Sequence, residues 1–173
     1  MLIKRNEITN DSSNESMDIT DNYLNSKYFD HLNSNLNSNT FPWFWTQKVY
    51  GVNDIHNYHF SHVFYKDNRI HSQMWFPLIE NFISLLKPKS LIRIKANLTM
   101  RTEKQIIFEN HIDQEFDCKV AIFYLNSNNG YTLINNKKIK SIKNRMLFFP
   151  NCEHTSSTTT DQPNRIVINF NYF

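Results

Sequence analysis

Residues 118–134 run CKVAIFYLNSNNGYTLI, and this stretch decides the fold that the sequence predicts. β-Branched and aromatic residues dominate 118–125 and 131–134, a composition typical of short strands. Between the two runs, Asn126-Ser-Asn-Asn-Gly130 gathers residues that favour turns. We therefore predict two strands separated by a turn.

Runs of the same kind lie on both sides of this stretch. They are Leu91–Thr99, Met146–Phe149 and Arg165–Phe173, with turn residues at Asn135-Asn136 and Pro150-Asn151. Upstream, apolar residues recur at helical spacing from Met74 to Leu86, with Pro77 near the first turn, and this predicts one helix. Several short strands behind one helix favour a mainly β fold with flanking helices (α+β), arranged as a β-sandwich or jelly roll.

A chain of 173 residues fits a single domain. Residues 1–40 are rich in Asn and Ser and carry three basic and six acidic side chains, so we expect a partly ordered N-terminal arm there. Phe41-Pro-Trp-Phe-Trp45 places four aromatic side chains around a proline, which we expect to be buried. The ordered domain is therefore predicted to span residues 41–173.

Composition excludes several classes of protein. Two glycines in the whole chain are too few for a Gly-rich nucleotide-binding loop. Neither a signal peptide nor a membrane span is predicted, because no apolar stretch is long enough. Cys118 and Cys152 are too few for a secreted disulfide framework, so a cytoplasmic protein with reduced cysteines and no membrane partner is expected.

The chemistry is predicted to centre on His111, Asp113 and His154. His111-Ile112-Asp113 comes directly before a predicted strand, and an extended backbone sends side chains two residues apart to one face. His154 follows Asp113 by 41 residues, just past a predicted strand end. Two imidazoles and one carboxylate form the facial triad of non-haem iron sites, which leaves metal positions open for a 2-oxo acid and O2.

Arg165 is the candidate for holding a second carboxylate. It follows His154 by eleven residues and begins the last predicted strand, on the same face as Val167 and Asn169. A guanidinium group there could bind a distal carboxylate in a bidentate manner.

These motifs together resemble the 2-oxoglutarate/iron(II) dioxygenases of the prolyl-hydroxylase-like group, small members of which occur in marine phages. The residues that carry the resemblance are His111-x-Asp113, Ile122-Phe-Tyr-Leu-Asn126, Asn129-Gly-Tyr-Thr132, His154 and Arg165. The similarity is strong from residue 91 to the end of the chain and looser over 41–90. It implies a double-stranded β-helix, the cupin-like jelly roll, with Fe(II) bound by His111, Asp113 and His154.

The resemblance also implies roles for three further residues. Arg165 would bind the far carboxylate of 2-oxoglutarate, the Tyr124 hydroxyl would touch the co-substrate, and Asn97 would have a weaker co-substrate role. The implied reaction uses O2 and 2-oxoglutarate, releases succinate and CO2, and hydroxylates an unidentified acceptor. A protein side chain such as proline is favoured; a nucleotide or a small molecule comes next, while nucleic acid is not favoured and the oligomeric state stays open.

The sequence departs from the family pattern at two points. Many relatives have two glycines where this chain has Asn129-Gly130, and a longer insert between the positions of Asp113 and His154. A shorter lid or barrel wall is implied, which leaves the choice of acceptor open.

Other interpretations compete with an oxygenase. A non-catalytic jelly-roll or cupin-like module could use its pocket, or the basic hairpin Lys137–Arg145, for recognition. In such a module Tyr124 would be a core residue, Asn97 structural and Arg165 a surface ion-pair partner. A metal enzyme without a co-substrate would normally have further histidines near His111, and the sequence has none.

Two more patterns have ordinary explanations. His56, His59 and His62 recur every three residues and could form a second metal site, but a loop or short helix with ordinary hydrogen bonds is favoured. On the strand from Leu91, one face is entirely polar, and it is either solvated or a pocket wall. Its members are Arg93, Lys95, Asn97, Thr99 and Arg101.

Overall fold

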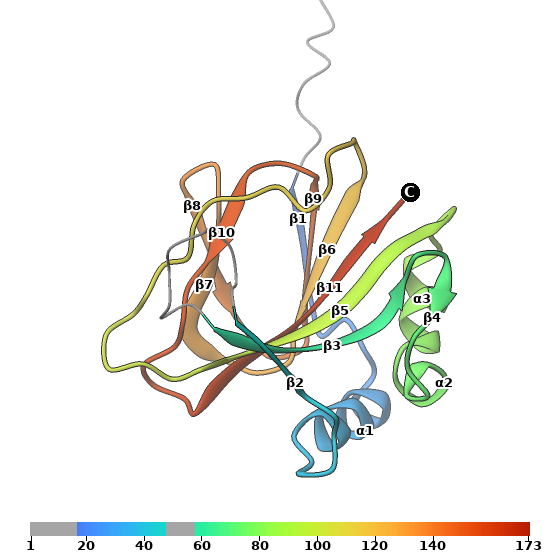
Figure 1. Cartoon of the computed structure of the whole chain (residues 1–173), viewed down its shortest axis with the longest axis horizontal. Coiled ribbons are helices and arrows are strands. Elements are labelled where there is room, and N and C mark those ends of the chain that lie inside the picture. Colours follow the sequence, from blue (N-terminus) through green and yellow to red (C-terminus); the bar gives the residue numbers. More distant parts are fainter. Residues whose placement is uncertain (1–16, 48–57) are drawn as a thin grey trace, which may run out of the picture.

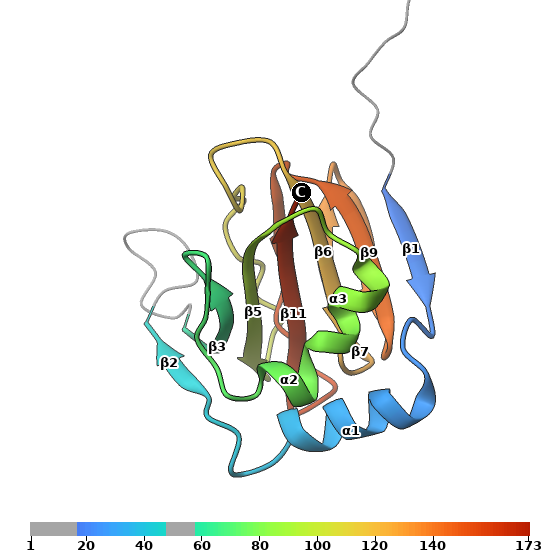
Figure 2. The ribbon, with the colours of Figure 1, turned by 90° about the vertical axis from the view of Figure 1, so that its right-hand side faces the viewer.

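The computed structural model describes residues 17–47 and 58–173. Two antiparallel sheets face each other, and the helices cover the outer face of the larger one (Figures 1 and 2). This is the jelly roll that the sequence predicts, mainly β with flanking helices. None of the helices in the described segments is long and apolar enough to span a membrane.

The larger sheet has eight strands in the order β1-β9-β6-β11-β5-β3-β2, with β4 paired to β3. Its strands are β1 (Asp18–Asp21), β2 (Phe44–Thr46), β3 (His59–Lys66), β4 (Arg69–Ile70), β5 (Leu91–Met100), β6 (Lys119–Tyr124), β9 (Arg145–Pro150) and β11 (Asn164–Tyr172). Apart from β2, β3 and β4, neighbouring strands of this sheet are far apart in the chain, so its centre rests on long-range pairing. β11 lies between β5 and β6 and is buried along nearly its whole length.

The smaller sheet has the order β10-β7-β8, formed by β7 (Asn128–Ile134), β8 (Lys137–Ser141) and β10 (His154–Ser156). Asn135 and Asn136, with φ of 47° and 63°, form the two-residue turn between β7 and β8. The segment before β6 continues this sheet through isolated bridges, Ile107 to Ser157 and His111 to His154. The segment that carries the first predicted metal ligand is thereby held against β10.

Three helices pack on the larger sheet, α1 (Ser26–Leu36), α2 (Trp75–Leu78) and α3 (Glu80–Leu86). The single helix predicted from Met74 to Leu86 is divided into α2 and α3. The break lies at Ile79, whose φ of −112° is far from the helical value of about −63°. α3 ends at Lys87 in the left-handed conformation, directly before Pro88.

Residues 17–40, which the composition suggested as a partly ordered arm, carry β1 and α1. β1 pairs with β9, and the Asn25 side chain caps α1 by accepting from the Tyr28 N–H. Four side chains of this region, Leu24, Phe29, Leu32 and Leu36, are buried in the core between helices and sheet. Such burial explains the scattered apolar positions in an otherwise polar sequence.

The aromatic segment from Phe41 is buried only in part. Phe41 is 7% exposed, while Phe44 and Trp45 are 62% and 61% exposed, contrary to the expectation that the whole segment is buried. The reason is topological, because β2 is the edge strand of the larger sheet.

The histidine repeat does not form a metal site within the described residues, and His56 lies outside them. His59 and His62 lie on strand β3, where a loop or short helix was expected. Residues three apart on a strand point to opposite faces. His62 packs among aromatic rings of the core, with its ring centroid 4.7 Å from that of Phe41 and 4.6 Å from that of Phe64. His59 faces the space between the two sheets.

The space between the sheets has an apolar part and a polar part. The apolar part is a small second core formed by Val120, Ile122, Tyr124, Ile134, Ile139, Leu147, Phe149 and Val167. Along β5, Ile94, Ala96 and Leu98 point to the helices and belong to the main core. The alternating polar residues therefore point between the sheets, where they border a pocket.

Candidate active site

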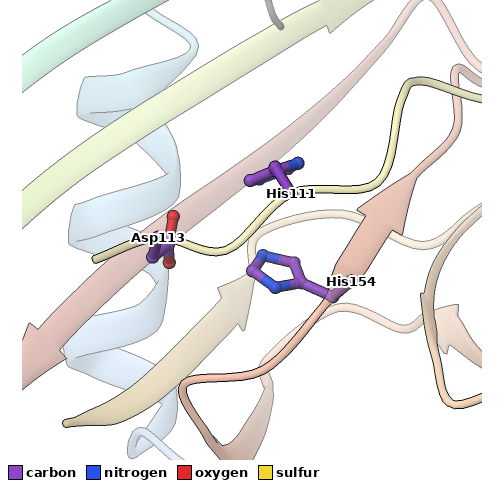
Figure 3. Close-up of side chains that lie close together, drawn as sticks. All are labelled: His111, Asp113 and His154. Atoms are coloured by element: carbon purple, nitrogen blue, oxygen red, sulfur yellow. The ribbon is translucent and has the colours of Figure 1, made fainter. Parts of the chain in front are cut away.

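His111, Asp113 and His154 meet between the two sheets (Figure 3). One possible ligand atom from each residue lies within 4.8 Å of those of the other two. His111 and Asp113 come from the irregular segment before β6, and His154 is the first residue of β10. The three residues that the sequence singled out as metal ligands therefore converge in the fold.

Both imidazoles are oriented by the main chain. The Nδ1 atom of His111 lies 3.2 Å from the Glu109 carbonyl oxygen, and that of His154 lies 2.8 Å from the Cys152 carbonyl oxygen. A carbonyl oxygen only accepts hydrogen bonds, so each Nδ1 carries the proton. In the neutral ring, Nε2 is then the nitrogen whose lone pair can bind a metal.

The Asp113 carboxylate is held by three donors. Arg93 Nη2 donates to Oδ1 at 2.9 Å, and the amides of Asn169 and Asn171 both donate to Oδ2 at 2.9 Å. Each carboxylate oxygen has two lone pairs. Oδ2 has used both on these bonds and Oδ1 only one, so Oδ1 keeps a lone pair for a cation.

The protonation states also suit a divalent cation. Burial by itself would raise the pKa of the Asp113 carboxyl, but Arg93, His154 and the amides of Asn171 and Asn169 outweigh it, so the net pKa is lowered. Burial, followed by the proximity of His154, lowers the pKa of His111. At neutral pH the carboxylate is therefore charged and the His111 ring is neutral, as metal ligands must be.

Two nitrogen donors and one carboxylate oxygen are the donor set of non-haem Fe(II) sites. Among the residues that the structure describes, this is the group of His, Cys, Asp or Glu side chains close enough together to hold a metal ion. The donor set, the fixed tautomers and the ionised carboxylate all fit such a metal.

A pocket extends from the triad between the sheets, and Arg93, Lys95, Asn97 and Thr99 of β5 form one wall of it. The polar face of β5 is thus a pocket wall along most of its length, while Arg101 lies beyond the end of the strand and is exposed. The remaining lining residues are His59, Phe108, Ile122, Thr132, Ser156, Arg165, Val167 and Asn169.

Arg165 lies at the inner end of this pocket and is only 3% exposed. Its Nε donates to Ser141 Oγ at 2.9 Å and its Nη2 to Thr132 Oγ1 at 3.1 Å. Within the described segments no carboxylate lies within 4.0 Å of it, so the surface ion-pair interpretation is wrong. A buried, unneutralised guanidinium is costly unless an anion binds to it.

Tyr124 is fully buried behind Arg165. The Arg165 guanidinium carbon lies 5.6 Å from the centroid of the Tyr124 ring, and the hydroxyl donates to Thr132 Oγ1 at 2.8 Å. Its side chain supports the guanidinium and does not border the pocket. Asn97 does border the pocket, and its Oδ1 is buried without a hydrogen-bond partner among the described residues.

Gly130 makes room for Arg165. A Cβ atom at this position would lie 2.8 Å from Arg165 Cδ and 3.1 Å from the carbonyl oxygen of Thr158. Real Cβ atoms essentially never come as close as 2.8 Å, so a side chain here would displace the arginine. The close approach of Arg165 thus explains, on steric grounds, why the motif Asn129-Gly-Tyr-Thr132 has a glycine at its second position.

Sequence analysis did not assign a role to several residues of the site. Arg93, Asn169 and Asn171 bind Asp113, and His59 and Lys95 line the pocket. The alternation of polar and apolar residues along β5 and β11 was the available signal. It identifies one face of each strand, but it does not reveal that the two faces meet at Asp113.

No protein-family model matches the sequence, and comparison with curated proteins finds no match either. Solved structures do match. A prolyl hydroxylase from Trichoplax adhaerens, in complex with a hypoxia inducible factor oxygen degradation domain peptide fragment, has a TM-score of 0.63 and 18% identity, covering 91% of this chain and 83% of that one. A prolyl-4-hydroxylase from Pseudomonas putida has a TM-score of 0.62 and 8% identity, covering 90% and 91%.

The non-heme alpha ketoglutarate dependent epimerase SnoN from nogalamycin biosynthesis also matches, with a TM-score of 0.62 and 11% identity over 91% of this chain and 77% of that one. These structural neighbours are 2-oxoglutarate–Fe(II) oxygenases, prolyl hydroxylases among them. At such identities the likeness shows the fold. Because the group contains both hydroxylases and an epimerase, the reaction of this chain must be argued from its own site.

Proposed function

We propose that the protein is a 2-oxoglutarate- and Fe(II)-dependent oxygenase that hydroxylates an acceptor. One observation carries the proposal: the same pocket contains a three-residue metal-binding group and a buried arginine that has no carboxylate partner among the described residues. The metal-binding group explains where a metal would bind, and the arginine explains why an anion must also enter. A metal and a dicarboxylate together satisfy both features.

In this proposal His111, Asp113 and His154 hold Fe(II). The bound metal, with O2 and 2-oxoglutarate, supplies the oxidising chemistry, in which one oxygen atom goes to succinate as CO2 leaves and the other to the acceptor C–H. The chain's own part is to orient the ligands. The Glu109 and Cys152 carbonyl oxygens fix the imidazole tautomers, and Arg93 with the two asparagine amides fixes the carboxylate.

Arg165 is proposed to bind the distal carboxylate of 2-oxoglutarate. Its side chain is fixed by the Ser141 and Thr132 hydroxyls, so little conformational entropy is lost on binding. Tyr124 does not line the pocket, so it is proposed to act on the co-substrate site indirectly, through its hydrogen bond to Thr132 and its contact with Arg165. Asn97, which lines the pocket, is proposed to contribute a weaker contact through its amide N–H, because its Oδ1 can only accept and the co-substrate has no donor.

The favoured acceptor is a protein side chain such as proline, with a nucleotide or a small metabolite as alternatives. Support for proline comes from the resemblance in sequence and from the two prolyl hydroxylases among the structural neighbours.

Spectroscopy under anaerobic conditions tests the proposal. Purified protein with Fe(II) and 2-oxoglutarate should show the weak visible absorption band of a 2-oxo acid chelated to ferrous iron, and admitting O2 should produce succinate. Asp113→Ala should lose both, while Lys119→Gln, a charge change at an exposed residue of β6, should keep both. A wild-type protein with neither band nor succinate would contradict the proposal.

Arg165→Ala separates an oxygenase from a non-catalytic binding module. In an oxygenase this variant keeps Fe(II) and loses 2-oxoglutarate binding, and succinate formation stops with it. If a metal-loaded wild type binds ligands but never consumes 2-oxoglutarate, the binding module is the correct interpretation.

A further inference from the structure

Lys95 is a third cationic side chain of the pocket, besides Arg93 and Arg165, and the proposed roles do not use it. It lies on β5 among the pocket-lining residues, and no described residue forms a salt bridge or hydrogen bond with its ammonium group, although Asp113 is near enough to favour the charged form. Arg93, its neighbour on the same face, is by contrast satisfied by Asp113 and by Asn171 Oδ1 at 3.1 Å. Burial, with Arg93 nearby, lowers the pKa of Lys95 to about 8, so the ammonium group is still mainly charged at neutral pH.

The strand register places Lys95 next to the metal-binding group. Lys95 lies opposite Asn169 in the β5–β11 pairing, and the Asn169 amide donates to Asp113. Residues directly opposite on antiparallel strands are about 5 Å apart at Cβ. Arg165 lies opposite Thr99 instead, four positions further along β5. The two cations thus occupy different ends of the pocket, roughly 13 Å apart along the strand.

Two buried polar atoms without hydrogen-bond partners lie on the pocket wall that carries Lys95. His59 Nδ1 and Asn97 Oδ1 are both buried without a hydrogen-bond partner among the described residues, and both side chains line the pocket. His59 and Asn97 also interact with each other, since Asn97 raises the pKa of His59, but neither Nδ1 nor Oδ1 has a partner at hydrogen-bond geometry, so a ligand could complete their pairing. This observation is independent of the charge on Lys95.

A count of the charges in the pocket separates the role of Lys95 from the binding of the co-substrate. The two positive charges of Fe(II) and the two negative charges of 2-oxoglutarate cancel. Among the described residues that line the pocket, Arg93, Lys95 and Arg165 then stand against one carboxylate, that of Asp113. Both carboxylates of the co-substrate already have partners in the proposed function, one on the metal and one on Arg165. The loaded pocket therefore keeps an excess of positive charge on the side of Lys95.

We infer that the acceptor carries an anionic group, a carboxylate or a phosphate, which pairs with Lys95 beside the metal site. This inference rests on the proposed oxygenase function and narrows its substrate class. Asn97 Oδ1 can only accept, so it would pair with a donor next to the anionic group, and His59 Nδ1 would pair with the anion when it carries the ring proton. An acceptor held in this way presents a carbon close to its own charged group to the metal.

Paramagnetic relaxation tests the inference without knowledge of the acceptor. Mn(II) replaces Fe(II), and the non-reactive analogue N-oxalylglycine saturates the co-substrate site. The probes are inorganic phosphate, followed by its ³¹P signal, and acetate, followed by its methyl ¹H signal, with acetamide as the neutral match for acetate. A probe that binds beside the metal relaxes faster, and the two anions distinguish phosphate from carboxylate recognition.

Wild type and Lys119→Gln should speed the relaxation of at least one anion well beyond that of acetamide. Lys95→Gln should weaken this binding about tenfold or more, because a charge-assisted hydrogen bond is lost. Lys95→Arg should keep much of the effect, since the charge remains. N-oxalylglycine affinity should be the same in all four proteins.

Each of three results would overturn this inference and leave the proposed function standing. The first is equal relaxation of acetamide and both anions, and the second is unchanged anion binding in Lys95→Gln. The third is a loss of N-oxalylglycine affinity in Lys95→Gln. The last result would assign Lys95 to the co-substrate. Failure of the wild type to bind Mn(II) at all would instead overturn the proposed function, and the inference with it.

Discussion

His111 and His154 form an antiparallel bridge in which the backbone N–H of each residue donates to the carbonyl oxygen of the other at 3.0 Å. Their rings are 4.5 Å apart between centroids. The two imidazoles are thus placed by main-chain pairing between segments 43 residues apart in the chain. Since the backbone sets their separation, the metal site is largely formed before a metal binds.

Because side-chain amides hold the Asp113 carboxylate, we expect the loss of one amide to weaken metal binding. Asn171→Ala removes one of the two donors to Oδ2 and one of the acceptors of Arg93, so the carboxylate becomes less firmly oriented. We expect metal affinity to fall about 10- to 100-fold, the usual effect of losing a residue that orients a ligand. Mn(II) titration followed by electron paramagnetic resonance measures it. Asn39→Ala, at an exposed residue between α1 and β2, is the control.

Arg165→Met should separate co-substrate binding from metal binding. The variant keeps an unbranched apolar stem while it removes the group that donates to Ser141 and Thr132. Loss of a buried charge-assisted contact costs about 3 kcal/mol, which corresponds to roughly a hundredfold weaker binding of N-oxalylglycine. Calorimetry on the Zn(II)-loaded protein measures this change.

Metal affinity in Arg165→Met should be unchanged, and Arg101→Gln, at an exposed arginine, should bind the analogue normally. Normal binding of the analogue by Arg165→Met would show that its carboxylate is held elsewhere.

Gly130→Ala should disturb the co-substrate site although Gly130 itself does not line the pocket. The added methyl group would meet Arg165 Cδ at 2.8 Å and a backbone carbonyl at 3.1 Å. Overpacking of this kind costs about 1–3 kcal/mol in stability. Both the melting temperature and N-oxalylglycine affinity should therefore fall, while Mn(II) binding persists. A variant with wild-type affinity for the analogue would show that the arginine can move aside freely.

Because His59 is buried, we expect the stability of the metal-free protein to depend on pH. Burial, together with Lys95, lowers the pKa of His59 from 6.5 to about 4. Between those values the unfolded chain binds a proton and the folded chain does not, so stability falls as the pH decreases through this window. The contribution reaches about 1.4 kcal/mol per pH unit.

Urea unfolding of wild type and His59→Gln at several values between pH 7 and pH 4 isolates this contribution, because the other titrating groups are common to both proteins. The free energy of unfolding should fall more steeply with decreasing pH in the wild type. Parallel curves would show that His59 is protonated in the folded protein over the same range.

Local sequence patterns predicted the strands that form the centre of the fold. The runs around β5, β6, β7, β9 and β11 were identified because alternation and β-branched residues mark a strand wherever it later pairs. β3, β8 and β10 were not predicted, since their polar and charged residues mask the alternation. The amount of secondary structure in residues 17–40 was underestimated for a similar reason. Leu32 and Leu36 are isolated apolar residues in a polar sequence, yet both are fully buried.

Motif spacing alone was enough to identify the three proposed metal ligands and Arg165, because spacing is a property of the chain. The tertiary structure alone decided that Arg93, Asn169 and Asn171 hold Asp113, that Gly130 accommodates Arg165, and that His59 and Lys95 share the pocket. The physical reason is that alternation specifies which face of a strand a side chain occupies. Which strand lies beside it, and in what register, is decided by pairing between segments far apart in the sequence.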